Sequence, residues 1–224
     1  MKKLMILILF MCTSAQASFA DMLELDFTKK YNISGVPVAT SAVYSGTKMT
    51  LTGTGTAFKK YGVSRAKIFM MQYFTQFPKN FVRESDKALS SIKDVGNTAI
   101  RLTFMRNIDS TMISQTLSEY VVSNIPKDEL PRYVGDINGL TQAITPDSSF
   151  VLGDSIAIHA YKNLLVYENA KKQIHIITSS NADLTTKLFS MFIGKTSEYE
   201  TNSLKAQLLQ NPKDVFGEEV LTIQ

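Results

Sequence analysis

The chain has 224 residues, of which 44% are hydrophobic, and its formal net charge is +4. That length suffices for one domain with a sizeable core. No basic cluster is larger than Lys59-Lys60 with Arg65 and Lys67, so nucleic acid is not expected as a partner.

Residues 1–20 predict a signal peptide that is cleaved on export. The segment contains, in order, a basic start, a short apolar run and small residues at two cleavage positions: Lys2-Lys3, residues 4–11, and Ala17 or Ala20. The apolar run is too short to anchor a protein in a bilayer. We therefore expect a periplasmic or secreted protein without a transmembrane segment after cleavage.

Cleavage also removes Cys12, the single cysteine of the chain. The mature protein then has no disulfide, no cysteine-bound zinc and no thiol nucleophile. Lys2 and Lys3 leave with the same acid-free segment, so the net charge of +4 becomes +2. Lipidation of Cys12 is a weaker alternative, because a lipoprotein site has small residues just before its cysteine.

The remaining chain shows no linker or repeat, which predicts a single domain over residues 21–211 and a C-terminal tail over residues 212–224. A short strand over residues 49–51 is expected to end in a turn formed by Gly53 and Gly55. Glycine is typical of the turns that end strands.

Two longer strands follow. Residues 66–74 are apolar on both faces, which is typical of a central strand. Residues 98–105 alternate between apolar and polar side chains and predict a half-buried strand.

Helices come next in the chain. Asp109 or Ser110 can cap a helix that ends at Pro126, and a second helix is expected over residues 128–144. The remaining elements are three strands and two helices: residues 154–161, 164–168, 173–178, 183–193 and 203–209. This order predicts an α+β fold in which helices cover one face of an antiparallel sheet.

Few residues offer catalytic or metal chemistry. Gly53-x-Gly55 with Lys59-Lys60 lacks the helix that a phosphate-binding loop requires, so a structural turn is preferred. His159 and His175 lie in strands that could pair, but they have no third ligand for zinc and no Gly-x-Ser-x-Gly nucleophile motif. We expect ordinary strand histidines, and neither a metal nor a cofactor.

Two features have both a structural and a functional interpretation. Arg106, at a strand end, could clamp a carboxylate or pair with Asp109. The apolar run of Phe69, Met71 and its neighbours could line a pocket for an apolar ligand or simply fill the core.

Several segments, taken in order and spacing, resemble the chalcone isomerase-like superfamily in its bacterial exported branch. They span residues 51–209: Gly53-x-Gly55, Lys67-Ile68-Phe69, Tyr73-Phe74, Leu102-x-Phe104-x-Arg106, Leu117-Ser118-Glu119, Gly153-Asp154-Ser155-Ile156, residues 189–195 and Ser203-Leu204-Lys205. The resemblance implies an open-faced β-sandwich, in which a large antiparallel sheet carries a layer of helices on one face, with a cleft between them.

Plant members of that family close a chalcone to a flavanone. Their site uses an arginine two residues after the second glycine, a threonine twelve residues later, and a tyrosine and an asparagine on the first helix. The corresponding positions here are Ala57, Phe69, Ile113 and Tyr120. A shift of two residues would place Lys59 at the arginine position.

Ring closure needs a cation and hydroxyl donors that stabilise phenolate and enolate charge, and Ala57, Phe69 and Ile113 provide neither. Because plant relatives bind fatty acids, the resemblance implies a non-catalytic protein that binds an apolar or amphipathic ligand, such as a fatty acid, in the sheet–helix cleft. The cleft candidates are Ala57, Lys59, Phe69, Met71, Arg106, Ile113 and Tyr120.

Two alternatives remain open at this point. The first is an isomerase of the intramolecular lyase type that acts on a non-chalcone substrate through Arg106, Tyr120 or Lys59. The second is an interaction protein of the cell envelope that binds no ligand. The oligomeric state is not predicted.

Overall fold

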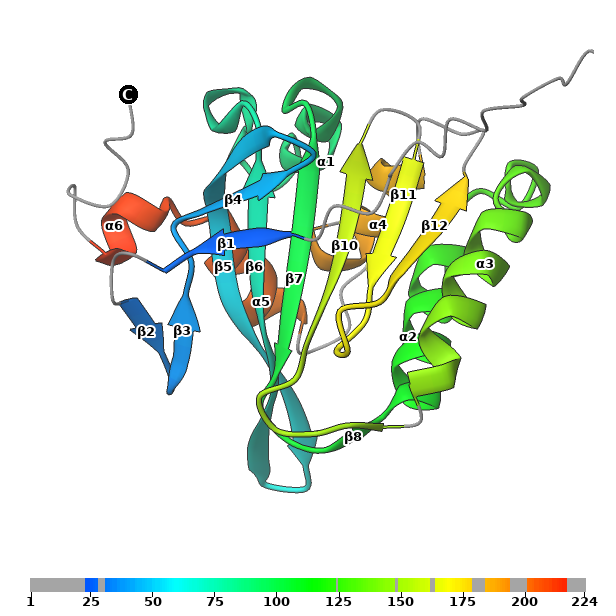
Figure 1. Ribbon diagram of the computed structural model, residues 1–224, viewed down its shortest axis with the longest axis horizontal. Coiled ribbons are helices and arrows are strands. Elements are labelled where there is room, and N and C mark those ends of the chain that lie inside the picture. Colours follow the sequence, from blue (N-terminus) through cyan, green and yellow to red (C-terminus); the bar gives the residue numbers. More distant parts are fainter. Residues whose placement is uncertain are drawn as a thin grey trace, which may run out of the picture.

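The computed structural model describes residues 23–27, 31–123, 125–147, 149–161, 164–178, 184–193 and 201–216. The expected signal peptide lies outside these ranges. An eight-stranded antiparallel sheet organises the domain, in the order β1-β4-β5-β6-β7-β10-β11-β12 (Figure 1). Its strands are β1 (Glu24–Asp26), β4 (Ser41–Tyr44), β5 (Thr47–Tyr61), β6 (Ser64–Thr75), β7 (Thr98–Phe104), β10 (Ser155–Tyr161), β11 (Leu164–Glu168) and β12 (Ile174–Thr178).

Shorter elements complete the described part of the fold. Two small antiparallel pairs are β2 (Tyr31–Ile33) with β3 (Val36–Val38), and β8 (Ile108–Asp109) with β9 (Ser149–Phe150). The α-helices are α1 (Ala88–Ser91), α2 (Ser110–Ser123), α3 (Val134–Ile144), α4 (Leu184–Ile193), α5 (Thr201–Leu209) and α6 (Pro212–Phe216). The 3-10 turns are η1 (Pro78–Asn80), η2 (Ile92–Asp94), η3 (Leu130–Arg132) and η4 (Thr145–Asp147).

The larger core lies between the sheet and helices α1 to α5. Alternate residues of β6, β7, β10 and β11 face this side, because successive side chains of a strand point to opposite faces. They meet the apolar stripes of the helices, and the contributors include Met71, Tyr73, Ile100, Ile113, Leu188 and Leu204. The predicted arrangement of an antiparallel sheet with helices on one face is therefore confirmed.

The opposite face is covered by the sheet itself, which curls over. In Figure 1, β1 crosses in front of β5, β6 and β7. The backbone N–H of Leu23, just before β1, donates to the Glu168 carboxylate of β11 at 2.9 Å. Tyr44 of β4 stacks on His159 of β10, with 4.6 Å between the ring centroids. A second, smaller apolar core fills the fold of the sheet.

Most of the strands and helices expected from the sequence are present, and the Asp109 cap is confirmed, since its carboxylate accepts a hydrogen bond from Thr111 N–H at 2.7 Å. The turn predicted at Gly53 and Gly55 is wrong, because both residues lie inside the long strand β5. Residues 212–216, expected to begin a tail, form α6, and Phe216 contacts the Tyr31 ring at 4.9 Å.

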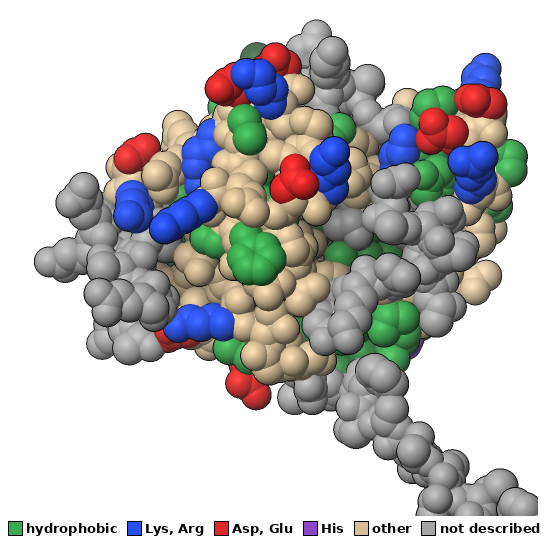
Figure 2. Space-filling model, turned by 90° about the horizontal axis from the view of Figure 1, so that it is seen from above, with side chains coloured by type: hydrophobic (Ala, Val, Ile, Leu, Met, Phe, Trp, Pro, Cys, Tyr) green, Lys and Arg blue, Asp and Glu red, His purple; other side chains and the backbone are tan. Residues whose placement is uncertain are grey.

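Charged side chains are mixed on the surface. On the end of the molecule seen from above, lysines and arginines lie interspersed with aspartates and glutamates (Figure 2). The described part of this face therefore shows a mixture of both charges rather than a basic stripe.

Candidate functional site

The pairing of β5, β6 and β7 brings two cleft candidates together. Ala57 lies directly opposite Phe69, and Phe69 lies opposite Phe104 of β7. Both Ala57 and Phe69 are partly buried and pack against the larger core. Ala57 and Phe69 are therefore cross-strand neighbours on the helix-facing side.

Met71 and Ile113 belong to the same core. Met71 lies two residues along β6 from Phe69 and is fully buried, while Ile113 projects from the first turn of α2. Four of the candidates, all apolar, thus share one continuous apolar region between sheet and helices. Their contact with a ligand stays a prediction.

The polar candidates lie at the margin of this region. Lys59 is exposed and follows Ala57 by two residues toward the β5–β6 hairpin end, and Arg106 is half-buried just after β7. The side chain of Tyr120 lies outside the described part of the chain. A backbone hydrogen bond from Met105 N–H to the Ile68 carbonyl, 2.9 Å long, holds the end of β7 against β6.

Helix α5 lies unusually close to β5, and the two glycines allow this. A Cβ atom at Gly53 would lie 2.4 Å from the backbone oxygen of Leu208, and one at Gly55 would lie 2.8 Å from Cβ of Gln207. The Gln207 amide accepts a hydrogen bond from Thr56 N–H at 3.0 Å and donates to the Thr56 carbonyl at 3.4 Å. A glycine within a strand often marks such a close approach, so this signal was present in the sequence.

Arg83 fastens the C-terminal end of α5. Its guanidinium donates to the carbonyls of Gln210 at 2.7 Å and Leu209 at 3.4 Å, and to the Thr52 carbonyl of β5 at 2.8 Å. It also lies over the Phe81 ring, 5.6 Å from the centroid. This role could not be predicted from local patterns, because Arg83 lies in an irregular segment.

Tyr73 is a buried phenol in the larger core. Its ring contacts Phe81 edge-on at 5.5 Å and Phe189 of α4 at 4.7 Å, measured between centroids. Only 2% of its surface is exposed, and its hydroxyl has no hydrogen-bond partner in the part of the chain that the structure describes. Burial raises the pKa of this phenol well above its usual range, so it is a neutral donor.

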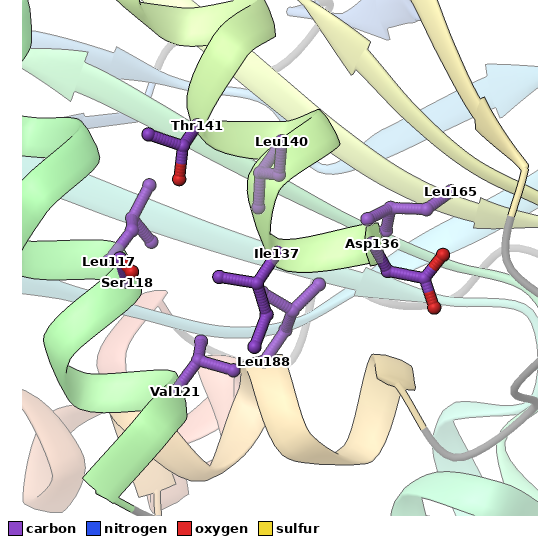
Figure 3. A pocket seen from close by; sticks show the side chains of 9 residues that line it. All are labelled: Leu117, Ser118, Val121, Asp136, Ile137, Leu140, Thr141, Leu165 and Leu188. Carbon is purple, nitrogen blue, oxygen red and sulfur yellow. The ribbon is translucent and has the colours of Figure 1, made fainter. Parts of the chain in front are cut away.

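A small cavity lies among α2, α3, α4 and β11 (Figure 3). Its volume is about 10 Å³, enough for roughly one water molecule. It is lined by Leu117, Ser118, Val121, Asp136, Ile137, Leu140, Thr141, Leu165 and Leu188. A wider, open groove of about 550 Å³ runs between α3 and β12 and is lined by Gly135, Asp136, Gly139, Gln142, Ala143, His175, Ile176 and Ile177.

The two histidines do not meet. They lie on β10 and β12, and β11 runs between these strands. His159 is buried with its Nε2 atom 3.6 Å from the Glu168 carboxylate, while His175 contacts the Tyr167 ring at 5.9 Å. Among the described residues, no group of three or more His, Cys, Asp or Glu side chains could hold a metal ion.

Comparison with known proteins defines the fold class. The curled antiparallel sheet with helices on one face is the chalcone isomerase-like fold. The crystal structure of a fatty-acid binding protein from Arabidopsis thaliana is similar, with a TM-score of 0.58, 12% sequence identity, and coverage of 84% of this chain and 96% of that chain. No protein-family model and no curated protein sequence matches the chain. Within the described residues, none of the helices has the length and apolar character needed to cross a membrane.

Proposed function

We propose that this chain is an exported, non-catalytic protein that binds an apolar or amphipathic small molecule, such as a fatty acid, between the sheet and the helices. The observation that carries the proposal is the shared fold with a fatty-acid binding protein, which extends over most of both chains. Export is inferred from the pattern of residues 1–20.

The chemistry around Ala57 supports binding rather than catalysis. Ala57, Phe69 and Ile113 are apolar and lie in or against the larger core. Such side chains suit an acyl chain, because ligand sites are mostly apolar with a few polar groups that fix orientation. They supply neither a cation nor a proton donor for an enolate.

A ligand that enters beneath α2, α3 and α4, next to the apolar candidates, requires the helix layer to move. Sites for small molecules usually have volumes of about 300–1,000 Å³, whereas the cavity beneath α2, α3 and α4 measures about 10 Å³. These helices meet the sheet through apolar contacts, which can separate and re-form around an acyl chain. Binding is then coupled to a displacement of at least one helix.

The proposal is tested with protein exported by its own N-terminal segment and purified from the periplasmic fraction. Native mass spectrometry and solvent extraction should show a bound acyl ligand, and the delipidated protein should bind members of a fatty-acid panel. Its mass should also show cleavage after Ala17 or Ala20. A ligand-free protein that binds no member of the fatty-acid panel would overturn the binding function. Retention of the protein in the cytoplasm would overturn export.

One observation favours a second candidate function. The closed helix layer, with its cavity of about 10 Å³, also suits an envelope protein that acts by contact with other proteins and holds no ligand. The same measurement separates the two functions. A protein that stays ligand-free through the whole panel, yet is exported and folded, fits this second function alone.

A further inference from the structure

Among the described residues, two hydroxyl groups on the side of the larger core are buried without a hydrogen-bond partner. They belong to Tyr73 of β6 and Thr98 of β7. Tyr73 pairs with Ile100, so Thr98, two residues from Ile100 on the same face, is a diagonal neighbour of Tyr73. Both side chains are buried, with exposed fractions of 2% and 3%.

An unsatisfied buried hydroxyl is costly. Leaving such a group without a partner destabilises a protein by about 1–3 kcal/mol, and phenylalanine at position 73 would keep the same ring contacts without that cost. Tyr167, a second buried tyrosine of this core, differs in this respect, since its hydroxyl donates to the Asp147 carboxylate at 2.8 Å. The unpaired state of Tyr73 therefore points to an acceptor that arrives with a ligand.

The surroundings of Tyr73 connect it to the apolar candidates. Tyr73, Met71 and Phe69 follow one another on the helix-facing side of β6. At about 3.3 Å per residue along a strand, Phe69 lies roughly 13 Å from Tyr73. An acyl chain along β6 would thus have a polar end at Tyr73 and an apolar path past Met71 toward Phe69.

Helix α4 separates Tyr73 from the small cavity. Phe189 contacts the Tyr73 ring, and the preceding residue, Leu188, lines the cavity (Figure 3). An outward shift of α4 would open the region between this cavity and Tyr73 and expose the hydroxyl to a ligand. Because Phe189 covers the Tyr73 ring, a displacement of α4 would uncover this side chain.

We propose that the hydroxyls of Tyr73 and Thr98 receive the carboxyl group of a fatty acid whose chain lies along β6 beneath a displaced α4. This inference rests on the proposed function and specifies the polar end of its site. Tyr73 supplies the main hydrogen bond, since its hydroxyl projects further from the sheet than that of Thr98.

The test measures binding of dodecanoic acid to delipidated protein by isothermal titration calorimetry. Tyr73→Phe should weaken binding by about tenfold to a hundredfold, the range for a hydrogen bond to a charged group. Thr98→Val should weaken it less. Tyr167→Phe is the matched control, because it removes a paired hydroxyl from the same core and should leave the affinity within about twofold of wild type.

Folding and mechanism are checked separately. The unliganded Tyr73→Phe variant should be at least as stable as wild type, because it loses only an unsatisfied group. The bound carboxyl resonance of dodecanoic acid labelled with ¹³C at C1 should shift between wild type and Tyr73→Phe. Wild-type affinity in Tyr73→Phe would overturn this inference alone, whereas a wild-type protein that binds no fatty acid would overturn the proposed function as well.

Discussion

Gly53 and Gly55 allow helix α5 to approach strand β5 closely, because neither residue carries a Cβ atom. Each lies where α5 approaches β5, and at Gly53 the nearest atom to an added Cβ would be a backbone oxygen rather than a flexible side chain. A backbone atom cannot rotate away, so the whole helix would have to move. These two residues therefore determine how closely α5 covers the sheet beside Ala57.

Gly53→Ala should destabilise the protein by about 1–3 kcal/mol, the usual effect of overfilling a packed region. The measurement is urea denaturation followed by circular dichroism. Gly135→Ala in α3 is the control, since no atom lies within 4 Å of its added Cβ and alanine favours a helix by about 1 kcal/mol. A Gly53→Ala protein as stable as wild type would contradict the close approach of α5.

At the scale of elements, hydrogen bonds from two side chains hold α5 against β5. Gln207 bonds the backbone of Thr56, and Arg83 bonds the last carbonyls of the helix together with Thr52. A cation at a helix C-terminus also interacts favourably with the helix dipole. Arg83 thus joins three segments that are far apart in the sequence.

Arg83→Ala should lower the free energy of unfolding by about 1.5–3 kcal/mol, as expected for hydrogen bonds from a charged donor. Arg83→Lys should lower the free energy of unfolding by a smaller amount, because its ammonium group keeps the charge but lacks the planar guanidinium that bonds both α5 and β5. The amides of α5 should exchange their hydrogens faster in both variants than in wild type. Lys79→Ala, at an exposed position in the same segment, is the control and should leave the exchange rate of α5 unchanged. Unchanged exchange in α5 would refute the role of Arg83.

The strands and helices with strong periodicity could be predicted from the sequence. β6, β7 and the run from β10 to β12 carry enough β-branched, aromatic and alternating residues to be recognised, and α4 and α5 lie within two residues of their predicted starts. β1 to β4 were not predicted, because each has only three or four residues. Gly53 and Gly55 were misinterpreted, since the helix that explains them lies some 150 residues away.

The arrangement of the candidate residues was predictable only in part, and their role as a site stays a prediction. The family spacing placed Ala57 and Phe69 together, and the hairpin pairs them directly. Arg83 and Gln207 could not be found, because their partners are backbone atoms of remote segments. The unpaired hydroxyl of Tyr73 depends on every neighbour in the folded core, so no local pattern reveals it.

For the molecule as a whole, the buried Glu168 carboxylate connects the two ends of the curled sheet. Burial by itself would raise its pKa, but His159, Lys172 and the Leu23 N–H lower the pKa to about 2. The Lys172 ammonium lies 2.7 Å from the Glu168 carboxylate. Arg101 also interacts electrostatically with Glu168, and its guanidinium donates hydrogen bonds to the side chains of Gln72 and Ser155. Because the pKa falls on folding, ionised Glu168 stabilises the folded state above about pH 4.5, and this contribution disappears as the pH falls through 2.

Glu168→Gln should therefore flatten the acid branch of the stability profile. Each pH unit of pKa difference corresponds to about 1.4 kcal/mol, so wild type should lose about 3 kcal/mol more than the variant between pH 6 and pH 2. Urea denaturation at several pH values measures this difference. Equal acid losses in Glu168→Gln and wild type would contradict the assignment.

The contact between Leu23 and Glu168 joins residues that are 145 positions apart in the chain. During synthesis the N-terminal end emerges first, yet its partner on β11 follows only after most of the domain. Native contacts of such long range slow folding, because the chain entropy lost on closing the loop precedes the gain. The contact between the start of β1 and β11 can form only after β11 has been synthesised. The curled face of the sheet is therefore completed late, and its apolar inner side stays exposed until then.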